Sequence, residues 1–313
     1  MDKILITGAT GFIGFNLARY LLETNKFKLV LVDNLKRGKI DNSFSKLCKS
    51  KRVIFKRMDL TKTFKIKDNF KYVFHLASIV GVKNVNKNPI NTFENNILST
   101  INLIKSLKKN TKIILFSTSE VYSPLIFKNK NIMPLKENYD LLIPPQIINR
   151  DSYFLSKIIN EKICSLSNLK YIIFRPHNIY GPRMGLSHVI PELIKKMKNK
   201  KCLVYSPSHS RAFCYVSDAV KQICNITFNN KIYNEVFNIG NMKEEIKIFD
   251  LAKVIKKELS SRCKLLRGPV TSGSPPRRVP DMRKTLKKLK HHNFVKLSQG
   301  LKDTINWYIK NEK

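Results

Sequence analysis

The sequence is poor in acidic residues, and this shortage is its most unusual bulk property. Only 22 Asp and Glu stand against 59 Lys and Arg in 313 residues, which gives a formal net charge of +37. Lysine supplies most of the excess and is spread along the chain, without the interleaved aromatics or the reader motif that nucleic-acid modules carry. We therefore interpret the charge as a compositional bias at the surface. It argues against a specific nucleic-acid partner and leaves weak attraction to polyanions and to anionic small substrates.

Long apolar runs and paired cysteines are missing as well. No continuous apolar segment has transmembrane length, and the N-terminus lacks the apolar run and cleavage site of a signal peptide, so we expect a soluble, cytoplasmic protein with no membrane partner. The six cysteines lie far apart and form no C-x-x-C pair. This spacing excludes the usual zinc and redox motifs, and we expect reduced, packed thiols and no metal site.

Apolar segments alternate with helical ones over the first half of the chain. This alternation predicts an α/β protein of the Rossmann type, with a doubly wound parallel sheet that helices cover on both faces. Beyond about residue 165 the alternation loosens. We expect a dinucleotide-binding domain over residues 1–168 and a smaller α/β substrate-binding domain over 169–313, with segments that cross back to the first. The expected strands are KILITGA, FKLVLVDN, VIFKRMDL, YVFHLAS and KIILFSTS.

Three glycines, Gly8, Gly11 and Gly14, lie between the first expected strand and the helix that follows it. Gly8 permits a tight strand-to-helix turn, Gly11 lets the backbone approach a pyrophosphate, and Gly14 allows the helix to pack closely on the strand. The helix N-terminus then presents free N–H groups and a positive dipole end to the phosphates. The pattern predicts a dinucleotide-binding site.

An aspartate, Asp33, ends the second expected strand, at the distance from the glycines that suits a carboxylate on a ribose diol. Its charge would repel a 2′-phosphate, which favours NAD over NADP. Lys36 and Arg37 follow closely and could soften that repulsion. We expect tightly bound NAD.

Tyr153 and Lys157 are four residues apart on an expected helix, so their side chains share one face. A neighbouring ammonium favours the phenolate and lowers the pKa of a tyrosine, which makes the pair a plausible proton acceptor. The spacing alone favours an amphipathic helix with a snorkelling lysine, and the strand that precedes it reverses this interpretation. The polar residues Ser117 to Glu120 end the fifth expected strand, at the edge where parallel sheets bind ligands. They could instead cap the next turn.

The order of the motifs resembles a known family. TGATGFIG, VDN, HLAS, STSEVY, YFLSK, RPHNIYGPR, RAFCYVSD, FNIGN and RRVPD follow one another over nearly the whole chain. In this the sequence resembles the extended short-chain dehydrogenases/reductases of the nucleotide-sugar epimerase, dehydratase and decarboxylase group. The resemblance implies NAD as the cofactor, a nucleotide sugar as the substrate, and a homodimer built on the helices at residues 92–109 and 153–166.

The resemblance also implies roles for individual residues. Catalytic roles fall to Thr118, Tyr153, Lys157 and Glu120. Substrate contacts fall to Ser119, Asn178, Arg211 and Arg278, of which the two arginines suit a diphosphate, although each alone could be a solvated surface charge. Besides the three glycines, Asp33, Tyr153 and Lys157, the implied cofactor contacts are Phe12, Ile13, Asn34, Asp59, Leu60, Leu76, Ala77, Ser78, Asn96 and Pro176.

Several reactions begin with the same step, in which Tyr153 takes the proton of a C4 hydroxyl as the sugar is oxidised to a 4-ketone. We favour 4-epimerisation of a UDP-sugar. The run Thr118, Ser119 and Glu120 is similar to that of UDP-glucuronate decarboxylases, which are the alternative, whereas Ser119 argues against a 4,6-dehydratase because serine cannot protonate a leaving hydroxyl. A non-catalytic dinucleotide-binding protein is disfavoured by the presence of Thr118, Tyr153 and Lys157.

Overall fold

The chain forms two compact units in a computed structural model that describes residues 1–24, 27–64, 68–129, 131–289 and 293–311. The first unit comprises Met1–Val121, Ile143–Arg175 and Ile223–Phe237. The second comprises Tyr122–Leu142, Pro176–Gln222 and Asn238–Lys313. Within the described residues, no helix is both long enough and apolar enough to cross a membrane.

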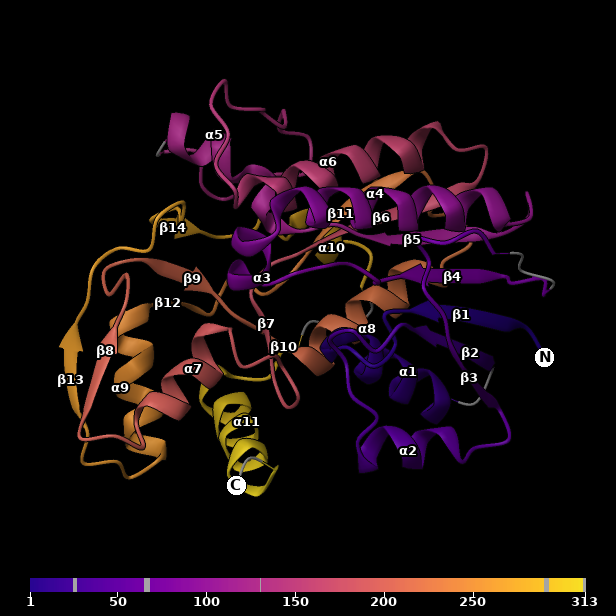
Figure 1. Cartoon of the computed structure of the whole chain (residues 1–313). Coiled ribbons are helices and arrows are strands. Elements are labelled where there is room, and N and C mark those ends of the chain that lie inside the picture. The colour runs from indigo at the N-terminus through magenta and orange to yellow at the C-terminus, as the bar shows by residue number, and fades with distance from the viewer. Residues whose placement is uncertain (25–26, 65–67, 130, 290–292, 312–313) are drawn as a thin grey trace. The chain divides into compact units, whose positions relative to one another are not determined.

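A seven-stranded sheet with the order β11-β6-β5-β4-β1-β2-β3 organises the first unit (Figure 1). From β3 to β6, neighbouring strands run parallel. The chain reverses its direction of travel across the sheet between β1 and β4, the switch point beside which such sheets bind ligands. The predicted doubly wound α/β fold is therefore confirmed. Its strands are β1 (Lys3–Thr7), β2 (Lys28–Asp33), β3 (Val53–Arg57), β4 (Tyr72–His75), β5 (Lys112–Phe116), β6 (Lys170–Pro176) and β11 (Glu235–Ile239).

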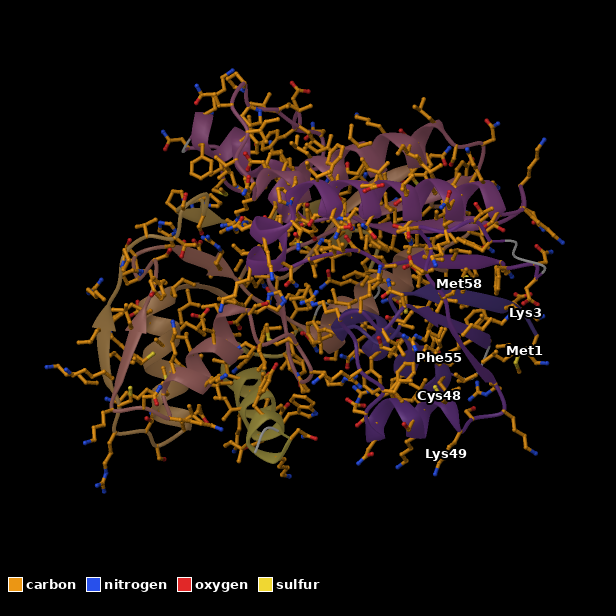
Figure 2. The ribbon with its side chains drawn as sticks, viewed as in Figure 1. Met1, Lys3, Cys48, Lys49, Phe55 and Met58 are labelled. Atoms are coloured by element: carbon orange, nitrogen blue, oxygen red, sulfur yellow. The ribbon has the colours of Figure 1, made fainter. Side chains whose placement is uncertain are left out.

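Helices cover both faces of this sheet, which explains why its central strands carry consecutive apolar residues, Ile4–Ile6 in β1 and Ile113–Phe116 in β5. Figure 1 shows α1 (Phe12–Glu23) and α2 (Asn42–Cys48) on one face, and α4 (Pro89–Ser106) and α6 (Asp151–Leu166) side by side on the other. The short α3 (Val82–Lys87) precedes α4. At the edge of the sheet, Phe44 of α2 meets Phe55 of β3, labelled in Figure 2, edge to face with ring centroids 5.2 Å apart.

Each unit is made of three separate segments of the chain, so a single boundary at residue 168 does not describe the division fully. Residues 169–175 and 223–237 belong to the first unit because they complete and buttress its sheet. Buried Lys112 of β5 donates hydrogen bonds to the carbonyls of Thr227 (3.2 Å) and Ile232 (3.0 Å). An ammonium suits the negative end of a helix dipole, and this contact ties the segment to the sheet.

The second unit is built around a buried polar hub, Asn238. Its side-chain oxygen accepts hydrogen bonds from Tyr122 (3.1 Å) and His177 (3.0 Å), and its amide donates to the Leu135 carbonyl (2.9 Å). The second unit also contains three small sheets, β10-β7, β12-β9-β14 and β13-β8. The strands are β7 (Ile179–Tyr180), β8 (Lys201–Val204), β9 (Ser210–Ala212), β10 (Cys214–Tyr215), β12 (Glu245–Lys247), β13 (Lys264–Arg267) and β14 (Arg277–Arg278). The helices are α5 (Ser123–Lys128), α7 (Val189–Lys196), α8 (Val216–Thr227, which continues into the first unit), α9 (Ile248–Glu258), α10 (Arg283–Leu286) and α11 (Leu297–Asn311).

Candidate active site

The glycine turn after β1 leaves no room for side chains at two of its positions. Gly8 has φ +68°, and a Cβ on it would lie 2.8 Å from the backbone nitrogen of Ala77. A Cβ on Gly14 would lie 2.3 Å from the Gly8 carbonyl oxygen. Gly11 is the N-cap of α1 and brings no capping side chain, so the N–H groups of Phe12 and Ile13 at the helix end are left to a ligand. This cradle fits the pyrophosphate of a dinucleotide.

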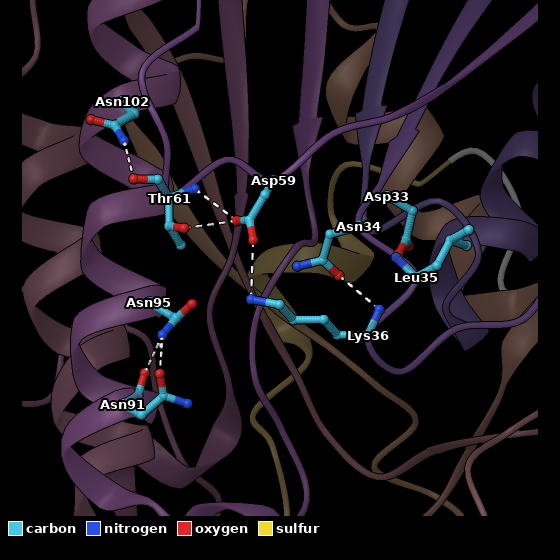
Figure 3. Close-up of polar contacts among 9 residues, drawn as sticks. All are labelled: Asp33, Asn34, Leu35, Lys36, Asp59, Thr61, Asn91, Asn95 and Asn102. Atoms are coloured by element: carbon cyan, nitrogen blue, oxygen red, sulfur yellow. Dashed lines mark hydrogen bonds and ion pairs between the residues drawn. The ribbon is translucent and has the colours of Figure 1, made fainter.

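The loop after β2 holds Asp33 in place through the backbone. Its carboxylate accepts hydrogen bonds from the N–H groups of Thr10 (3.1 Å) and Leu35 (2.8 Å). Figure 3 shows that Lys36 turns to Asp59 instead, with 3.0 Å between its Nζ and the carboxylate. Lys36 therefore does not neutralise Asp33, which keeps the negative charge that disfavours a 2′-phosphate.

A chain of hydrogen bonds beneath this loop runs through His75 at the end of β4. Thr100 donates to the Asn96 carbonyl (2.9 Å), so its hydroxyl oxygen accepts the Nε2–H of His75 (3.1 Å). Nδ1 is then the acceptor for the Thr7 hydroxyl (2.8 Å). Thr7 in turn accepts from the N–H of Ala77 (3.2 Å). Burial, together with the charge of Lys157, lowers the pKa of His75 to about 3, and the ring stays neutral.

This neutral histidine makes the protein sensitive to acid. The native pKa lies below the usual value of 6.5, so the unfolded chain binds the extra proton, and the free energy of unfolding falls as the pH drops below 6.5. The slope for one such group approaches about 1.4 kcal/mol per pH unit. We expect His75→Gln to reduce the difference between urea denaturation curves at pH 7 and pH 5. An unchanged difference in His75→Gln would contradict the assignment.

The loop of residues 76–79, which contains the predicted cofactor contacts Leu76, Ala77 and Ser78, is fixed by α4. Asn96, in the middle of that helix, accepts from the N–H of Ile79 (2.7 Å) and donates to its carbonyl (3.3 Å). The same amide donates to the Ser156 hydroxyl of α6 (3.0 Å). Asn96 thus connects the loop after β4 to the helix that carries Tyr153 and Lys157.

The Tyr153 and Lys157 side chains lie on one face of α6, as their spacing predicts. Lys157 is only 3% exposed. Its Nζ donates to the Phe116 carbonyl at the end of β5 (2.9 Å) and lies 5.9 Å from the centre of the Tyr153 ring. Burial lowers the pKa of Lys157 to about 8, although the negative charge of Glu161 opposes this. The arrangement places an ammonium beside a phenol at the ligand-binding edge of the sheet.

The residues after β5 bring hydroxyl and carboxylate groups to the same edge. Thr118 is nearly buried, and its hydroxyl accepts the N–H of Glu120 (3.2 Å). The Glu120 carboxylate pairs with Arg150, which lies directly before α6, at 3.3 Å. Sequence reasoning missed Arg150, although its position three residues before Tyr153 was a usable signal. Ser119 is buried at the start of a 3-10 helix, Ser119–Tyr122.

Three of the four residues predicted to hold the substrate, Asn178, Arg211 and Arg278, lie in the second unit, whereas Ser119 belongs to the first. Arg211 of β9 and Arg278 of β14 are direct partners in a parallel pair, and both are buried. Arg211 donates to the Ser210 carbonyl (2.7 Å) and to the Ser274 hydroxyl (2.7 Å). Asn178, with φ +42°, donates to the Ala212 carbonyl (3.0 Å) beside Arg211. The two arginines are therefore built into the unit and are not solvated surface charges. Pro176, a predicted cofactor contact, ends β6.

A doubly wound sheet, a glycine cradle and a Tyr-x-x-x-Lys pair at the sheet edge define a dinucleotide-dependent enzyme of the extended short-chain dehydrogenase/reductase type. The chain belongs to the NAD-dependent epimerase/dehydratase family, whose model matches residues 4–240. NAD is accordingly the cofactor, and the glycine cradle and Asp33 suit it.

Relatives of this chain carry out more than one reaction. It is 32% identical to a UDP-N-acetyl-α-D-glucosaminuronate decarboxylase of Bacillus cytotoxicus, over 98% of this chain and 97% of the relative. It is 30% identical to a putative UDP-glucose 4-epimerase of Methanocaldococcus jannaschii, over 99% of both. Among solved structures, it resembles the UDP-glucuronic acid 4-epimerase of Bacillus cereus with UDP-glucuronic acid and NAD, at a TM-score of 0.82 and 26% identity over 98% of this chain and 99% of that one.

Proposed function

We propose that this protein is a UDP-sugar 4-epimerase that works through a transient 4-keto sugar. The observation that carries the proposal is the Tyr153–Lys157 pair on α6, with the Lys157 ammonium tied to the end of β5 beside Thr118. When bound, NAD would accept a hydride from C4 of the sugar and later return it. The chain's own residues have to move the hydroxyl proton and hold the sugar.

Tyr153 is the proton acceptor in this proposal. Its phenol is half-buried, and the Lys157 ammonium stabilises the phenolate that forms when the phenol proton is lost. The Thr118 hydroxyl would donate a hydrogen bond to the reacting oxygen. After the keto sugar has turned, Tyr153 would return the proton to the C4 oxygen as the hydride is returned to the opposite face of C4, which gives the other C4 epimer.

Two arginines of the second unit support the proposal that the substrate is held by its nucleotide diphosphate. Arg211 and Arg278 lie opposite each other in register, and both are buried. Their planar donors suit phosphate oxygens, and an anion between them would offset their mutual repulsion. The relatives described above are enzymes of UDP-sugars.

Decarboxylation of a UDP-uronate is a second candidate, and the Glu120–Arg150 pair favours it. Arg150 lies three residues before Tyr153 and pairs with the carboxylate of Glu120, which is next to Thr118. The same guanidinium could instead attract the C6 carboxylate of a sugar acid. The 4-ketone would then stabilise the charge left when carbon dioxide departs. Ser119 offers no acid for the loss of a hydroxyl, which disfavours dehydration.

One experiment separates these outcomes. Purified protein is incubated with pooled UDP-, dTDP- and GDP-sugars that include UDP-glucuronate, and proton NMR follows the anomeric signals. New anomeric signals at unchanged mass would support the epimerase and name its sugar. Conversion of UDP-glucuronate to a pentose would replace it with the decarboxylase, and a 6-deoxy-4-keto product would indicate a dehydratase. A set of unchanged spectra would contradict the enzyme proposal.

We further propose a homodimer that forms through α4 and α6. These helices pack on each other, yet their outer surfaces keep apolar side chains exposed: Ile90 and Phe93 on α4 and Leu166 on α6. Half-buried Leu155 and Ile159 extend the apolar stripe on α6. Light scattering should give twice the chain mass of 36.3 kDa, and Phe93→Glu should lower it. A monomeric mass for the unaltered protein would refute the dimer.

A further inference from the structure

A carboxylate, that of Glu161, follows Tyr153 and Lys157 at the same four-residue interval on α6. It pairs with Arg175 of β6 through two hydrogen bonds, from Nε to Oε1 (3.0 Å) and from a terminal guanidinium nitrogen to Oε2 (2.7 Å). Both side chains are only 5% exposed. A bidentate ion pair buried to this extent has a fixed geometry, because neither partner can turn to solvent.

The arrangement changes what Glu161 can do to Lys157. Residues four apart on a helix can pair directly, and such a contact would draw the ammonium away from Tyr153. Arg175 occupies both oxygens of the carboxylate, and the ammonium of Lys157 donates to the Phe116 carbonyl instead. Glu161 therefore stabilises the charge of Lys157 through space while Lys157 stays beside the phenol.

Among the described residues, four other groups on or near α6 do not supply a negative charge. His75 of β4 is held neutral by its burial and by Lys157 itself. Cys164 of α6 is a thiol, because burial and the charge of Glu161 raise its pKa to about 12. From α4, Asn96 contributes an uncharged amide. Arg37 interacts electrostatically with Tyr153 and adds a positive charge. Among the described residues, Glu161 is the anion whose charge acts on Lys157 and raises its pKa.

We propose that the Glu161–Arg175 pair is a positioning couple that keeps Lys157 protonated and directed at Tyr153, and so sets the upper pH limit of proton transfer. The link to turnover rests on the proposed function; the effect on Lys157 does not. Removing the charge of Glu161 and removing that of Arg175 must shift the pKa of Lys157 in opposite directions. Loss of the negative charge leaves Lys157 with Arg175 alone and lowers its pKa, whereas loss of the positive charge raises it.

The test is a titration of the NAD-bound protein with ¹³C,¹⁵N-labelled lysine, followed by NMR. The Lys157 signal is assigned by its disappearance in Lys157→Arg. In Glu161→Gln, which keeps the side-chain shape, the pKa of Lys157 should fall by about one unit or more. In Arg175→Gln it should rise, and in the double variant it should return toward the original value. Glu94→Gln, at an exposed site of α4, is the matched control and should change nothing.

Turnover supplies the second measurement. The alkaline limb of the pH–rate profile should follow the NMR shift, moving to lower pH in Glu161→Gln, and Arg175→Lys should preserve it. A pair that only stabilises the fold would lower the melting temperature and leave the Lys157 titration unchanged, which would overturn the proposal. If Arg175→Gln does not fold, Glu161→Gln decides alone. If no nucleotide sugar is converted, the proposed function fails, but the NMR result still accepts or rejects the effect on Lys157.

Discussion

Replacing Tyr153 by phenylalanine is expected to lower turnover by about 10³-fold, because a positioned proton acceptor contributes on the order of 10² to 10⁴ in rate. The ring keeps its place on α6 and its contact with Lys157, so neither the fold nor NAD binding should suffer. The measurement is the rate of product formation by NMR under saturating substrate, together with the NAD content of the purified variant.

The matched control for this substitution is Tyr233→Phe. Tyr233 is a 46% exposed tyrosine whose ring lies under the ammonium of Lys170, so it repeats the Tyr–Lys contact away from β5 and α6. It should keep full activity. Equal activity in both variants would show that Tyr153 is not the proton acceptor, and it would revive the non-catalytic dinucleotide-binding protein.

Gly14→Ala is expected to damage the fold and the cofactor site together. The new Cβ would lie 2.3 Å from the Gly8 carbonyl oxygen, and backbone on both sides leaves no flexible group to move aside. Forcing α1 away from β1 should lower the free energy of unfolding by about 1–3 kcal/mol, the range for overpacked interiors. Chemical denaturation of the NAD-free protein measures this loss.

Gly11→Ala separates the two effects. Its Cβ would meet the nearest atom, the Gly8 oxygen, at 3.1 Å, which a small shift can relieve, so stability should change little. The methyl group would still stand at the N-cap of α1, where the pyrophosphate of NAD is expected, and NAD affinity should drop. If Gly11→Ala binds NAD normally by calorimetry, the pyrophosphate does not lie over this turn.

The parallel sheet and the glycine turn could be predicted because their signals are local. An apolar run that ends in Gly8, followed by helical spacing from Phe12, leaves few alternatives for a chain of this length. The Tyr153–Lys157 pair was equally local, since helix geometry alone puts residues four apart on one face. The Asp33 carboxylate also lies where its place at the end of a strand predicted, at the end of β2.

The ion-pair partners of charged residues could not be predicted from such local patterns. Lys36 was expected to moderate the charge of Asp33, but it pairs with Asp59, because the end of β3 lies beside the end of β2. The Glu161–Arg175 pair joins a helix to a strand, and no spacing in the sequence predicts which arginine pairs with which carboxylate. The same holds for Arg150 and Glu120, which belong to segments thirty residues apart.

The sequence by itself determined the family, the parallel-sheet architecture and the functional groups that lie at the ends of β1 and β5 and on α6. Each follows from short-range constraints: a turn that only glycine can make, strands that must be apolar on both faces, and a helix in which residues four apart share one face. The tertiary structure alone decided which charges are buried together. Strand pairing makes Arg211 and Arg278 neighbours. Burial keeps His75 neutral, and Glu161 acts on the buried Lys157 through space. Electrostatic effects of this size arise only where packing has excluded water.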